Sequence, residues 1–128
     1  MREYSCGKII VEYLKKEGVP FVVGLPGHGI LAFLDAFLGE EDHIEVLTVK
    51  HEQSAVHLAD GYCRATGKPL VVFTSVGPGA MNTLIGLGTA YSDSIPVIAF
   101  TATCPTYMFG KGALQTIVRH QGADVPKD

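Results

Sequence analysis

The stretch Ile44-Glu45-Val46-Leu47-Thr48-Val49-Lys50-His51-Glu52-Gln53-Ser54-Ala55 decides the fold class, because it joins a short apolar run to a helical pattern. Residues 44–49 have the composition of a buried strand. After them, apolar side chains recur at the spacing of a helix that lies against a sheet, at Ala55, Leu58, Ala59 and Tyr62. The stretch therefore predicts a strand followed at once by a covering helix.

Glu52 is the unusual residue of this stretch. It lies three residues before Ala55, which places it on the same helix face as the apolar side chains. An acid in this first turn can stabilise the helix N-terminus through the helix dipole. It can also be a buried functional acid, and its position alone leaves both interpretations open.

The chain before this stretch predicts another strand between two helices. Ser5 can cap a helix that runs to about Glu17 and ends at Gly18. Its expected inner face is Ile9, Ile10, Tyr13 and Leu14. A short strand at 21–23 leads into the glycine-rich turn 24–29. A second amphipathic helix follows, with apolar residues at Ile30, Phe33, Leu34, Phe37 and Leu38.

The chain after this stretch repeats the pattern. Gly67 and Pro69 end the Glu52 helix, and residues 70–74 form a continuous apolar strand. The loop 77–80 opens a helix that we expect to reach about Tyr91. Its small residues Gly86, Gly88 and Ala90 allow a close neighbour, either within the fold or at a subunit contact. A fourth strand is expected at 96–101.

Four strands that alternate with helices and are mostly apolar predict an α/β fold, a parallel sheet with helices on both faces. Ligands of such sheets bind beyond the carboxyl ends of the strands. Three distinctive stretches are expected at that edge, namely Gly24–Gly29, His51-Glu52 and Gly77–Asn82. The sequence therefore predicts one site built from three loops.

Composition narrows the classes of partner. The chain has 128 residues, enough for one domain, with 10 Lys+Arg against 13 Asp+Glu and a formal charge of −3. Because no basic cluster occurs, neither nucleic acid nor a membrane surface is expected as a partner. The spacing of Cys6, Cys63 and Cys104 fits neither zinc nor redox motifs, so we expect a reduced compartment and a packed Cys63 thiol. With no signal peptide or membrane span in the sequence, the expected location is cytoplasmic.

Several common motifs are excluded by their spacing. Gly24-Leu25-Pro26-Gly27-His28-Gly29 has proline where the dinucleotide fingerprint needs glycine. His57 lies six residues after His51, so the two do not form the H-E-x-x-H zinc motif and His57 is expected near the surface. No G-x-S-x-G elbow is present, which leaves serine hydrolase chemistry without an anchor. No metal ligands are predicted on this chain.

A set of motifs, taken together, identifies a family. They are Gly24-Leu25-Pro26-Gly27, His51-Glu52, Ala59-Asp60-Gly61-Tyr62, Gly77-Pro78-Gly79-Ala80-Met81-Asn82 and Asp93-Ser94-Ile95-Pro96. In this order and spacing, over about residues 4–117, they resemble the pyrimidine-binding domain of thiamine-diphosphate enzymes. The similar group includes acetolactate synthase, pyruvate decarboxylase and sulfopyruvate decarboxylase. The resemblance implies a three-layer α/β/α fold with a mostly parallel sheet, a flavodoxin-like variant.

The resemblance also implies a role for Glu52. In the family, a glutamate at this position hydrogen-bonds N1′ of the cofactor aminopyrimidine and shares a proton with it. The cofactor supplies the carbanion chemistry, and the protein supplies orientation and the proton. This chain is then expected to be the pyrimidine-binding half of a 2-oxo acid decarboxylase or carboligase.

The remaining matched residues receive lesser roles from the same resemblance. The expected cofactor-binding residues besides Glu52 are Gly24, Pro26, Gly27, Gly77, Pro78, Gly79, Asn82 and Gln115. His28 follows Pro-Gly, where relatives vary with substrate, so it is a candidate proton-transfer residue. A simple loop role remains an alternative for both His28 and Gln115.

The second half of such an enzyme has no counterpart in this chain. The family holds the diphosphate and Mg²⁺ with a Gly-Asp-Gly…Asn-Asn segment in another domain, and no such segment occurs here. We therefore expect a diphosphate-binding domain or subunit as partner, a homo- or hetero-oligomer, and no turnover by the chain alone. Residues 1–118 are expected to form the domain and 119–128 a tail or linker. A non-catalytic dimerising module with the same fold is the alternative.

Overall fold

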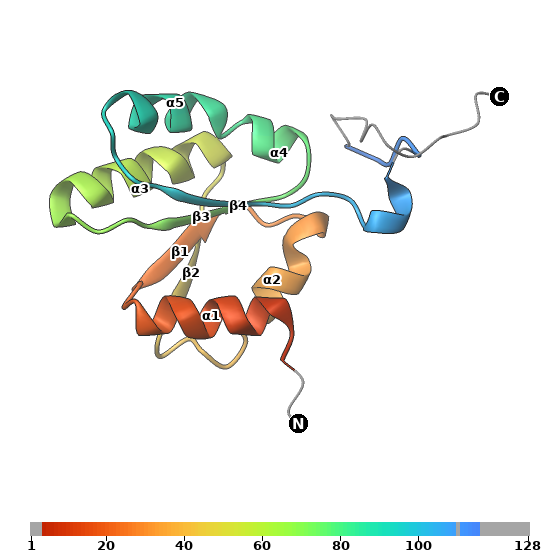
Figure 1. Cartoon of the computed structure of the whole chain (residues 1–128), viewed down its shortest axis with the longest axis horizontal. Coiled ribbons are helices and arrows are strands. Elements are labelled where there is room, and N and C mark those ends of the chain that lie inside the picture. The colour runs from red at the N-terminus through yellow and green to blue at the C-terminus, as the bar shows by residue number, and fades with distance from the viewer. Residues whose placement is uncertain (1–3, 110, 116–128) are drawn as a thin grey trace.

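The computed structural model describes residues 4–109 and 111–115, and these form a sheet with helices on either side (Figure 1). The helices are α1 (Cys6–Lys16), α2 (Leu31–Asp35), α3 (Glu52–Thr66), α4 (Pro78–Met81) and α5 (Leu84–Ser92), with short 3-10 turns η1 (His28–Ile30) and η2 (Thr106–Met108). The strands are β1 (Phe21–Gly24), β2 (Glu45–Thr48), β3 (Val71–Thr74) and β4 (Ile98–Thr101). The predicted tail, residues 119–128, lies outside the described residues.

The sheet is parallel, with strand order β2-β1-β3-β4. Helices α1 and α2 lie on one face, and α3 and α5 cover the other (Figure 1). This arrangement confirms the predicted α/β class and its three layers, and the strand order is that of flavodoxin-like sheets. Because the strands are parallel, the segments that follow β1, β2 and β3 all start at the same edge.

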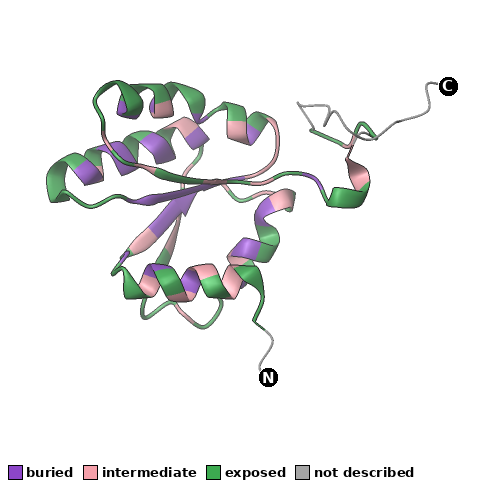
Figure 2. Cartoon of the chain, in the orientation of Figure 1, coloured by how far each residue is buried: buried purple, intermediate pink, exposed green. Residues whose placement is uncertain are grey.

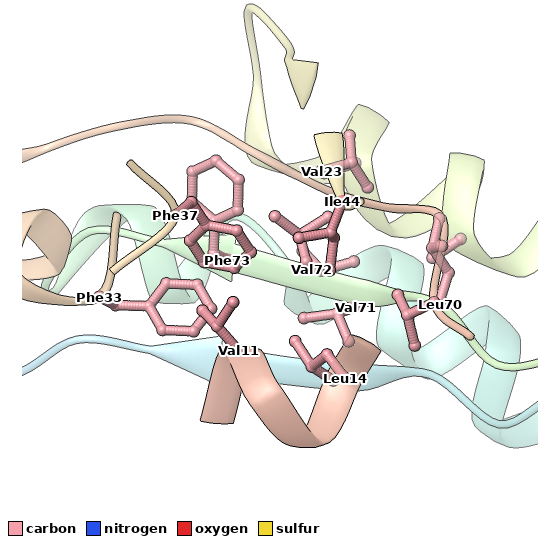
Figure 3. Close-up of a cluster of buried hydrophobic side chains, with 14 of the residues drawn as sticks. Val11, Leu14, Val23, Phe33, Phe37, Ile44, Leu70, Val71, Val72 and Phe73 are labelled. Carbon is pink, nitrogen blue, oxygen red and sulfur yellow. The ribbon is translucent and has the colours of Figure 1, made fainter. Parts of the chain in front are cut away.

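The two central strands hold the core. Val22 and Val23 of β1 and residues 71–73 of β3 have no exposed surface, and Figure 2 shows this burial concentrated at the centre of the sheet. Phe33 of α2 packs edge-on against Phe37, with ring centroids 5.0 Å apart, and lies 6.4 Å from the ring of Phe73 (Figure 3). Burying such side chains stabilises the fold by about 1.5–3 kcal/mol each, which fixes the strands whose ends carry the site.

The edge strands are less buried than the sequence predicts. In β2, Glu45 and Thr48 are exposed, and in β4 Ile98 retains 40% of its surface. Each of these strands has one hydrogen-bonded neighbour in the described sheet. A run of apolar residues does not distinguish a central strand from an edge strand, because both have the same period.

The inner face of α1 differs from the predicted one. Val11 and Leu14 are buried as part of the core, whereas Ile9 and Tyr13 are 58% and 61% exposed. Gly7 explains the rotation, since a Cβ at this position would lie 3.0 Å from both the Ala32 carbonyl oxygen and the Ala36 Cβ. The glycine lets α1 approach α2 closely and sets which face of α1 turns inward.

Two predicted helices are shorter than expected. The helix around Phe33 ends at Asp35 and continues as tight turns, with i to i−3 hydrogen bonds such as Phe37 N to Leu34 O at 3.0 Å. The helix predicted over 77–91 is two helices that meet at Thr83, whose hydroxyl donates to the Ala80 carbonyl at 2.6 Å. A buried hydroxyl satisfied by the backbone therefore marks a bend that periodicity does not reveal.

The stripe predicted for α3 is also narrower than expected. Ala55 and Ala59 are fully buried and Tyr62 is partly buried, but Leu58 retains 38% of its surface. Cys63 is buried at 6% exposure, as the packed-thiol interpretation predicts. The buried face of α3 contains Glu52 itself, at 6% exposure. The position of Glu52 on the core-facing side is therefore confirmed.

Candidate functional site

Three loops meet at the carboxyl edge of the sheet. The loop after β1 approaches the segment after β3, because a Cβ on Gly27 would lie 2.4 Å from the Ser75 hydroxyl oxygen. The start of α3 approaches α4, because a Cβ on Gly79 would lie 3.0 Å from Glu52 Oε1. The same Gly79 position lies 3.7 Å from the Ser75 Cβ. Stretches separated by about 25 residues each are thus packed into one cluster.

Glu52 is positioned by its helix and by one side chain. It is the first residue of α3, and His51 before it caps the helix, with His51 Nδ1 accepting from the Gln53 amide at 3.2 Å. Asn82 Nδ2 donates to Glu52 Oε2 at 3.0 Å. Among the described residues, Glu52 Oε1 takes part in no hydrogen bond. One carboxyl oxygen is therefore held by a neutral amide, and the other is available to a ligand.

Two glycines of the cluster stand where a larger residue would clash with a neighbour. An added Cβ on Gly24 would lie 2.0 Å from the Phe73 carbonyl oxygen, so the two central strands require glycine there. An added Cβ on Gly79 would press on the Glu52 carboxyl group at 3.0 Å. Gly79 thus leaves open the space beside Oε1, whereas Gly24 serves the packing of the sheet.

Gln115 reaches the cluster through its backbone. Gly77 has φ +53°, a left-handed conformation that favours glycine, and its Cα faces the Gln115 carbonyl, which a Cβ would approach to 1.7 Å. Gln115 itself has φ +61°. The segment at 111–115 therefore returns to the loop that opens α4, more than thirty residues earlier in the chain.

Comparison with known proteins decides the family. The family model described as "Thiamine pyrophosphate enzyme, N-terminal TPP binding domain" matches residues 5–123. The chain belongs to this family. The resemblance drawn from the motifs is therefore confirmed, and the three-loop cluster lies in a thiamine pyrophosphate enzyme N-terminal domain.

Similar proteins within the family include acetolactate synthases. The chain is 42% identical over 117 residues to the "Acetolactate synthase large subunit" of Haemophilus influenzae, which covers 90% of this chain and 20% of that protein. It is 46% identical over 108 residues to the "Probable acetolactate synthase large subunit" of Methanocaldococcus jannaschii, covering 84% and 18%. The mitochondrial catalytic subunit of Saccharomyces cerevisiae is 41% identical over 109 residues. The chain spans about a fifth of the length of these relatives.

Other predicted residues of this thiamine pyrophosphate enzyme domain lie at the rim of the cluster. Pro26 and His28 are exposed, and Pro78 is exposed at the first position of α4. His28 begins η1, and within the described residues its side chain makes no hydrogen bond or ion pair. The structure joins Gly27 and Gly79 through Ser75, and Gly79 and Asn82 through the Glu52 carboxyl group. The role of His28 stays a prediction.

Two site residues escaped the sequence interpretation. Ser75 lies between Gly27 and Gly79 and separates the two loops. The sequence feature that could have revealed Ser75 is its position, since it is a small polar residue directly after the buried strand β3. His51 was seen only as part of a motif, yet its ring caps α3 and so fixes the start of the helix that carries Glu52.

An ion-pair cluster holds the two helices behind the site together. Arg64 of α3 donates from Nε to Asp60 Oδ2 at 2.8 Å and from Nη2 to Asp93 Oδ2, at the end of α5, at 2.5 Å. The hydrogen bond from Arg64 lowers the pKa of the Asp60 carboxyl group, and both acids raise the pKa of Arg64. The cluster fastens α5 to α3 and so supports the helix layer that presents Asn82 to Glu52.

The remaining features of the surface do not add to this cluster. A groove of about 330 Å³ lies at the opposite edge, between the C-terminal parts of α1 and α3, and includes Tyr13, Pro20, Tyr62 and Ile98. Across residues 4–109 and 111–115, no three His, Cys, Asp or Glu side chains gather as a metal site. In the same part of the chain, no helix is both long enough and apolar enough to cross a bilayer.

Proposed function

We propose that the chain is the pyrimidine-binding half of a thiamine-diphosphate-dependent enzyme that decarboxylates or ligates 2-oxo acids. One observation carries the proposal. The Glu52 carboxyl group is 6% exposed, has Oε2 bonded to Asn82, and has Oε1 beside the bare Cα of Gly79. A buried acid with one oxygen left for a ligand is typical of a functional site rather than of a helix cap.

The residues present fit the aminopyrimidine half of the cofactor. A flat ring with a ring nitrogen needs a carboxyl group in its plane and backbone that can approach without side chains. Oε1 of Glu52 supplies the carboxyl oxygen. Gly79 and Gly27 supply backbone without side chains, since a Cβ on either would intrude on the cluster. The thiamine pyrophosphate enzyme family to which the chain belongs supports the same assignment.

Each residue then has a defined task. Glu52 would hold the ring nitrogen N1′ through Oε1 and would hold or share the proton there. Asn82 keeps Oε2 in place, so the carboxyl group cannot rotate away. Gly24, Gly27, Gly77 and Gly79, with Pro26 and Pro78, shape the loops around the ring. When bound, the cofactor supplies the carbanion chemistry, and the protein supplies orientation and the proton.

His28 and Gln115 are proposed for the substrate side of the site. The exposed His28 imidazole stands on the loop that starts at Gly24, where it could exchange protons with a 2-oxo acid. The Gln115 backbone packs on Gly77, so its side chain starts from the rim of the cluster. Both assignments rest on position and on the resemblance of the loops to the family.

The proposal requires a second part. The chain covers only 16–20% of the acetolactate synthases it resembles, and their remaining length offers room for a diphosphate-binding domain. We place Mg²⁺ and the diphosphate on that domain or subunit, and propose an oligomer, a cytoplasmic location and no turnover by the chain alone. Residues 1–118 are proposed as the pyrimidine-binding domain, with 119–128 as a tail or linker.

Amide NMR during titration with thiamine tests the site. Shifts are expected at Gly27, Glu52, Gly79 and Asn82, with weak affinity because the diphosphate has no partner here. Gly79→Ala should abolish these shifts, since its Cβ would meet Oε1. The matched control is Gly88→Ala, where an added Cβ meets no atom within 4 Å. Saturable shifts that map elsewhere, or none at millimolar thiamine, would reject the site.

A further inference from the structure

Ser75 is a polar side chain of the three-loop cluster that the proposed function does not use. It directly follows the buried strand β3 and is itself half-buried. An added Cβ on Gly27 would lie 2.4 Å from both the Ser75 Cβ and its hydroxyl oxygen, and an added Cβ on Gly79 would lie 3.7 Å from the Ser75 Cβ. The side chain therefore stands between the two loops that present glycine to the cluster.

The Ser75 hydroxyl has no partner in the part of the chain that the structure describes. Nearby hydroxyl groups differ, since Thr74 Oγ1 donates to the Ser75 carbonyl oxygen at 3.0 Å and Thr83 Oγ1 donates to the Ala80 carbonyl oxygen at 2.6 Å. A hydroxyl that is partly removed from water costs free energy until a ligand or a water molecule bonds to it. Ser75 therefore has unused capacity for a hydrogen bond.

The backbone around Ser75 is held in place before any ligand binds. Thr74 is fully buried in β3, its hydroxyl holds the Ser75 carbonyl oxygen, and its own carbonyl accepts from the Ala102 amide at 3.3 Å. On the other side of Ser75, the Val76 carbonyl accepts from the Gly79 amide at 3.2 Å. A side chain on such a fixed segment can orient a ligand without losing much conformational entropy.

Glu52 presents its open oxygen to the same place. A single point, the position of a Cβ on Gly79, lies 3.0 Å from Glu52 Oε1 and 3.7 Å from the Ser75 Cβ. Across residues 4–109 and 111–115, neither Oε1 nor the Ser75 hydroxyl takes part in a hydrogen bond. Two unsatisfied polar groups thus border the space that Gly79 leaves open. One is a carboxyl oxygen, and the other is a hydroxyl that can both donate and accept.

We propose that Ser75 is a positioning and specificity residue of this site, whose hydroxyl bonds to the polar edge of the aminopyrimidine, formed by N3′ and the 4′-amino group, while Glu52 holds N1′. One hydrogen bond leaves a flat ring free to turn about that bond, whereas a second bond fixes its orientation. A hydroxyl suits this edge, because it can donate to the ring nitrogen and accept from the amino group. The inference rests on the proposed function and adds a reason for preferring an aminopyrimidine to a ring with one polar atom.

Amide NMR titrations of the whole chain with two small rings test the inference. The first probe is the free aminopyrimidine alcohol that makes up one half of thiamine. The second is the pyridine alcohol of the same shape, which keeps the nitrogen corresponding to N1′ and lacks both N3′ and the amino group. Ser75→Ala should raise the dissociation constant of the pyrimidine about three- to tenfold, the usual effect of losing one hydrogen bond. It should leave the dissociation constant of the pyridine unchanged.

Ser54→Ala is the matched control. Ser54 lies two residues after Glu52, is exposed, and likewise has a hydroxyl without a partner among the described residues. Its replacement should change neither dissociation constant. Urea unfolding should show that Ser75→Ala is as stable as the wild type, since alanine still fills the space between Gly27 and Gly79 and no hydrogen bond within the described chain is lost.

Three outcomes would overturn the inference. If Ser75→Ala binds the pyrimidine as tightly as the wild type does, the hydroxyl does not bond to the ring. If the variant weakens both rings equally, Ser75 acts on the shape of the loops and not on the polar edge. In both cases the wild type still binds the pyrimidine with shifts at Glu52, so the proposed function stands. A wild type that does not bind the pyrimidine rejects the proposed function and this inference together.

Discussion

Glu52 and Glu40 are both acids held in place by the fold, and their partners differ in kind. Glu40 binds two cations, Lys15 Nζ at 2.6 Å and Lys8, which ties the loop before β2 to α1. These bonds, the one from Lys15 foremost, lower the pKa of Glu40 to about 2. Glu52 is more buried but has a neutral amide as its partner and glycine beside its second oxygen.

The difference teaches how to separate a structural acid from a functional one. A fully paired carboxylate is fixed in its charged form and has no capacity left for a ligand. A carboxyl group bonded once to a neutral donor keeps one oxygen for a ring nitrogen, and a missing side chain gives that ring access. The same substitution, glutamate to glutamine, should therefore act on turnover at Glu52 and on stability at Glu40.

Glu52→Gln should have the largest effect, and it should fall on turnover. Glutamine keeps the size and can still bond to Asn82 and to a ring nitrogen, but it cannot share a proton. In the enzyme assembled with its diphosphate-binding part, kcat for a 2-oxo acid should drop about 10²–10⁴-fold, or about 3–5 kcal/mol. The free energy of unfolding should change little. If Glu52→Gln instead destabilises the fold and leaves turnover per folded molecule unaltered, Glu52 is a structural acid like Glu40.

Asn82→Ala should affect stability more than Glu52→Gln does. It removes the donor to Glu52 Oε2 and leaves a buried carboxyl oxygen unsatisfied, which costs about 1–3 kcal/mol. Urea unfolding measures the loss. The double variant Asn82→Ala with Glu52→Ala is the control, because removing both partners should recover part of it. If the stability lost in the double variant equals the sum of the losses in Asn82→Ala and Glu52→Ala, the bond does not hold Glu52.

His51→Ala should cost about 1 kcal/mol of stability through loss of the α3 cap. His51→Asn should recover most of this, because asparagine is a strong N-cap residue that can accept from the Gln53 amide. Thermal unfolding of the three proteins makes the comparison. Should asparagine behave like alanine, His51 acts through something other than the cap.

Glu40→Gln should give the smallest effect at neutral pH and a clear pH dependence. The folded-state pKa of about 2 lies below the ordinary value of 4.5, so the charged form stabilises the fold above that ordinary value. This stabilisation fades as pH falls from about 4.5 toward 2. The variant should therefore be less stable than wild type near neutrality, and the gap should close in acid. A gap of constant size across this range, measured by denaturant unfolding, would exclude the ion pairs as its cause.

The sequence predicts the elements better than their packing. The apolar runs gave the parallel sheet, and the position of Glu52 on its helix followed from the period of Ala55 and Ala59. The buried face of α1 could not be predicted from the sequence, because it depends on the contact of Gly7 with α2, about twenty-five residues later in the chain. Glycine carries no side chain for a periodicity argument, although it decides which helices come closest.

The site shows the same division. Gly27, Glu52, Gly79 and Asn82 were predicted as members of one cluster, since parallel strands bring their following loops to one edge. Ser75 and the cap by His51 were not predicted, because the contacts of these two residues follow no repeating pattern in the sequence. The sequence showed α5 only as a run of small and apolar residues, whereas the structure shows that Gly86 is the one that packs against Val56 of α3.

Hydrogen–deuterium exchange at C2 of bound thiamine diphosphate tests the central claim most directly. It reports whether Glu52 shares a proton with the aminopyrimidine, without requiring knowledge of the 2-oxo acid. In the assembly with the diphosphate-binding part, the Glu52→Gln protein should exchange C2 about 10²–10⁴-fold more slowly than wild type, while Glu40→Gln exchanges at the wild-type rate. Equal exchange rates in folded wild type and Glu52→Gln, both with cofactor bound, would contradict the account and leave Glu52 as an acid of the helix start.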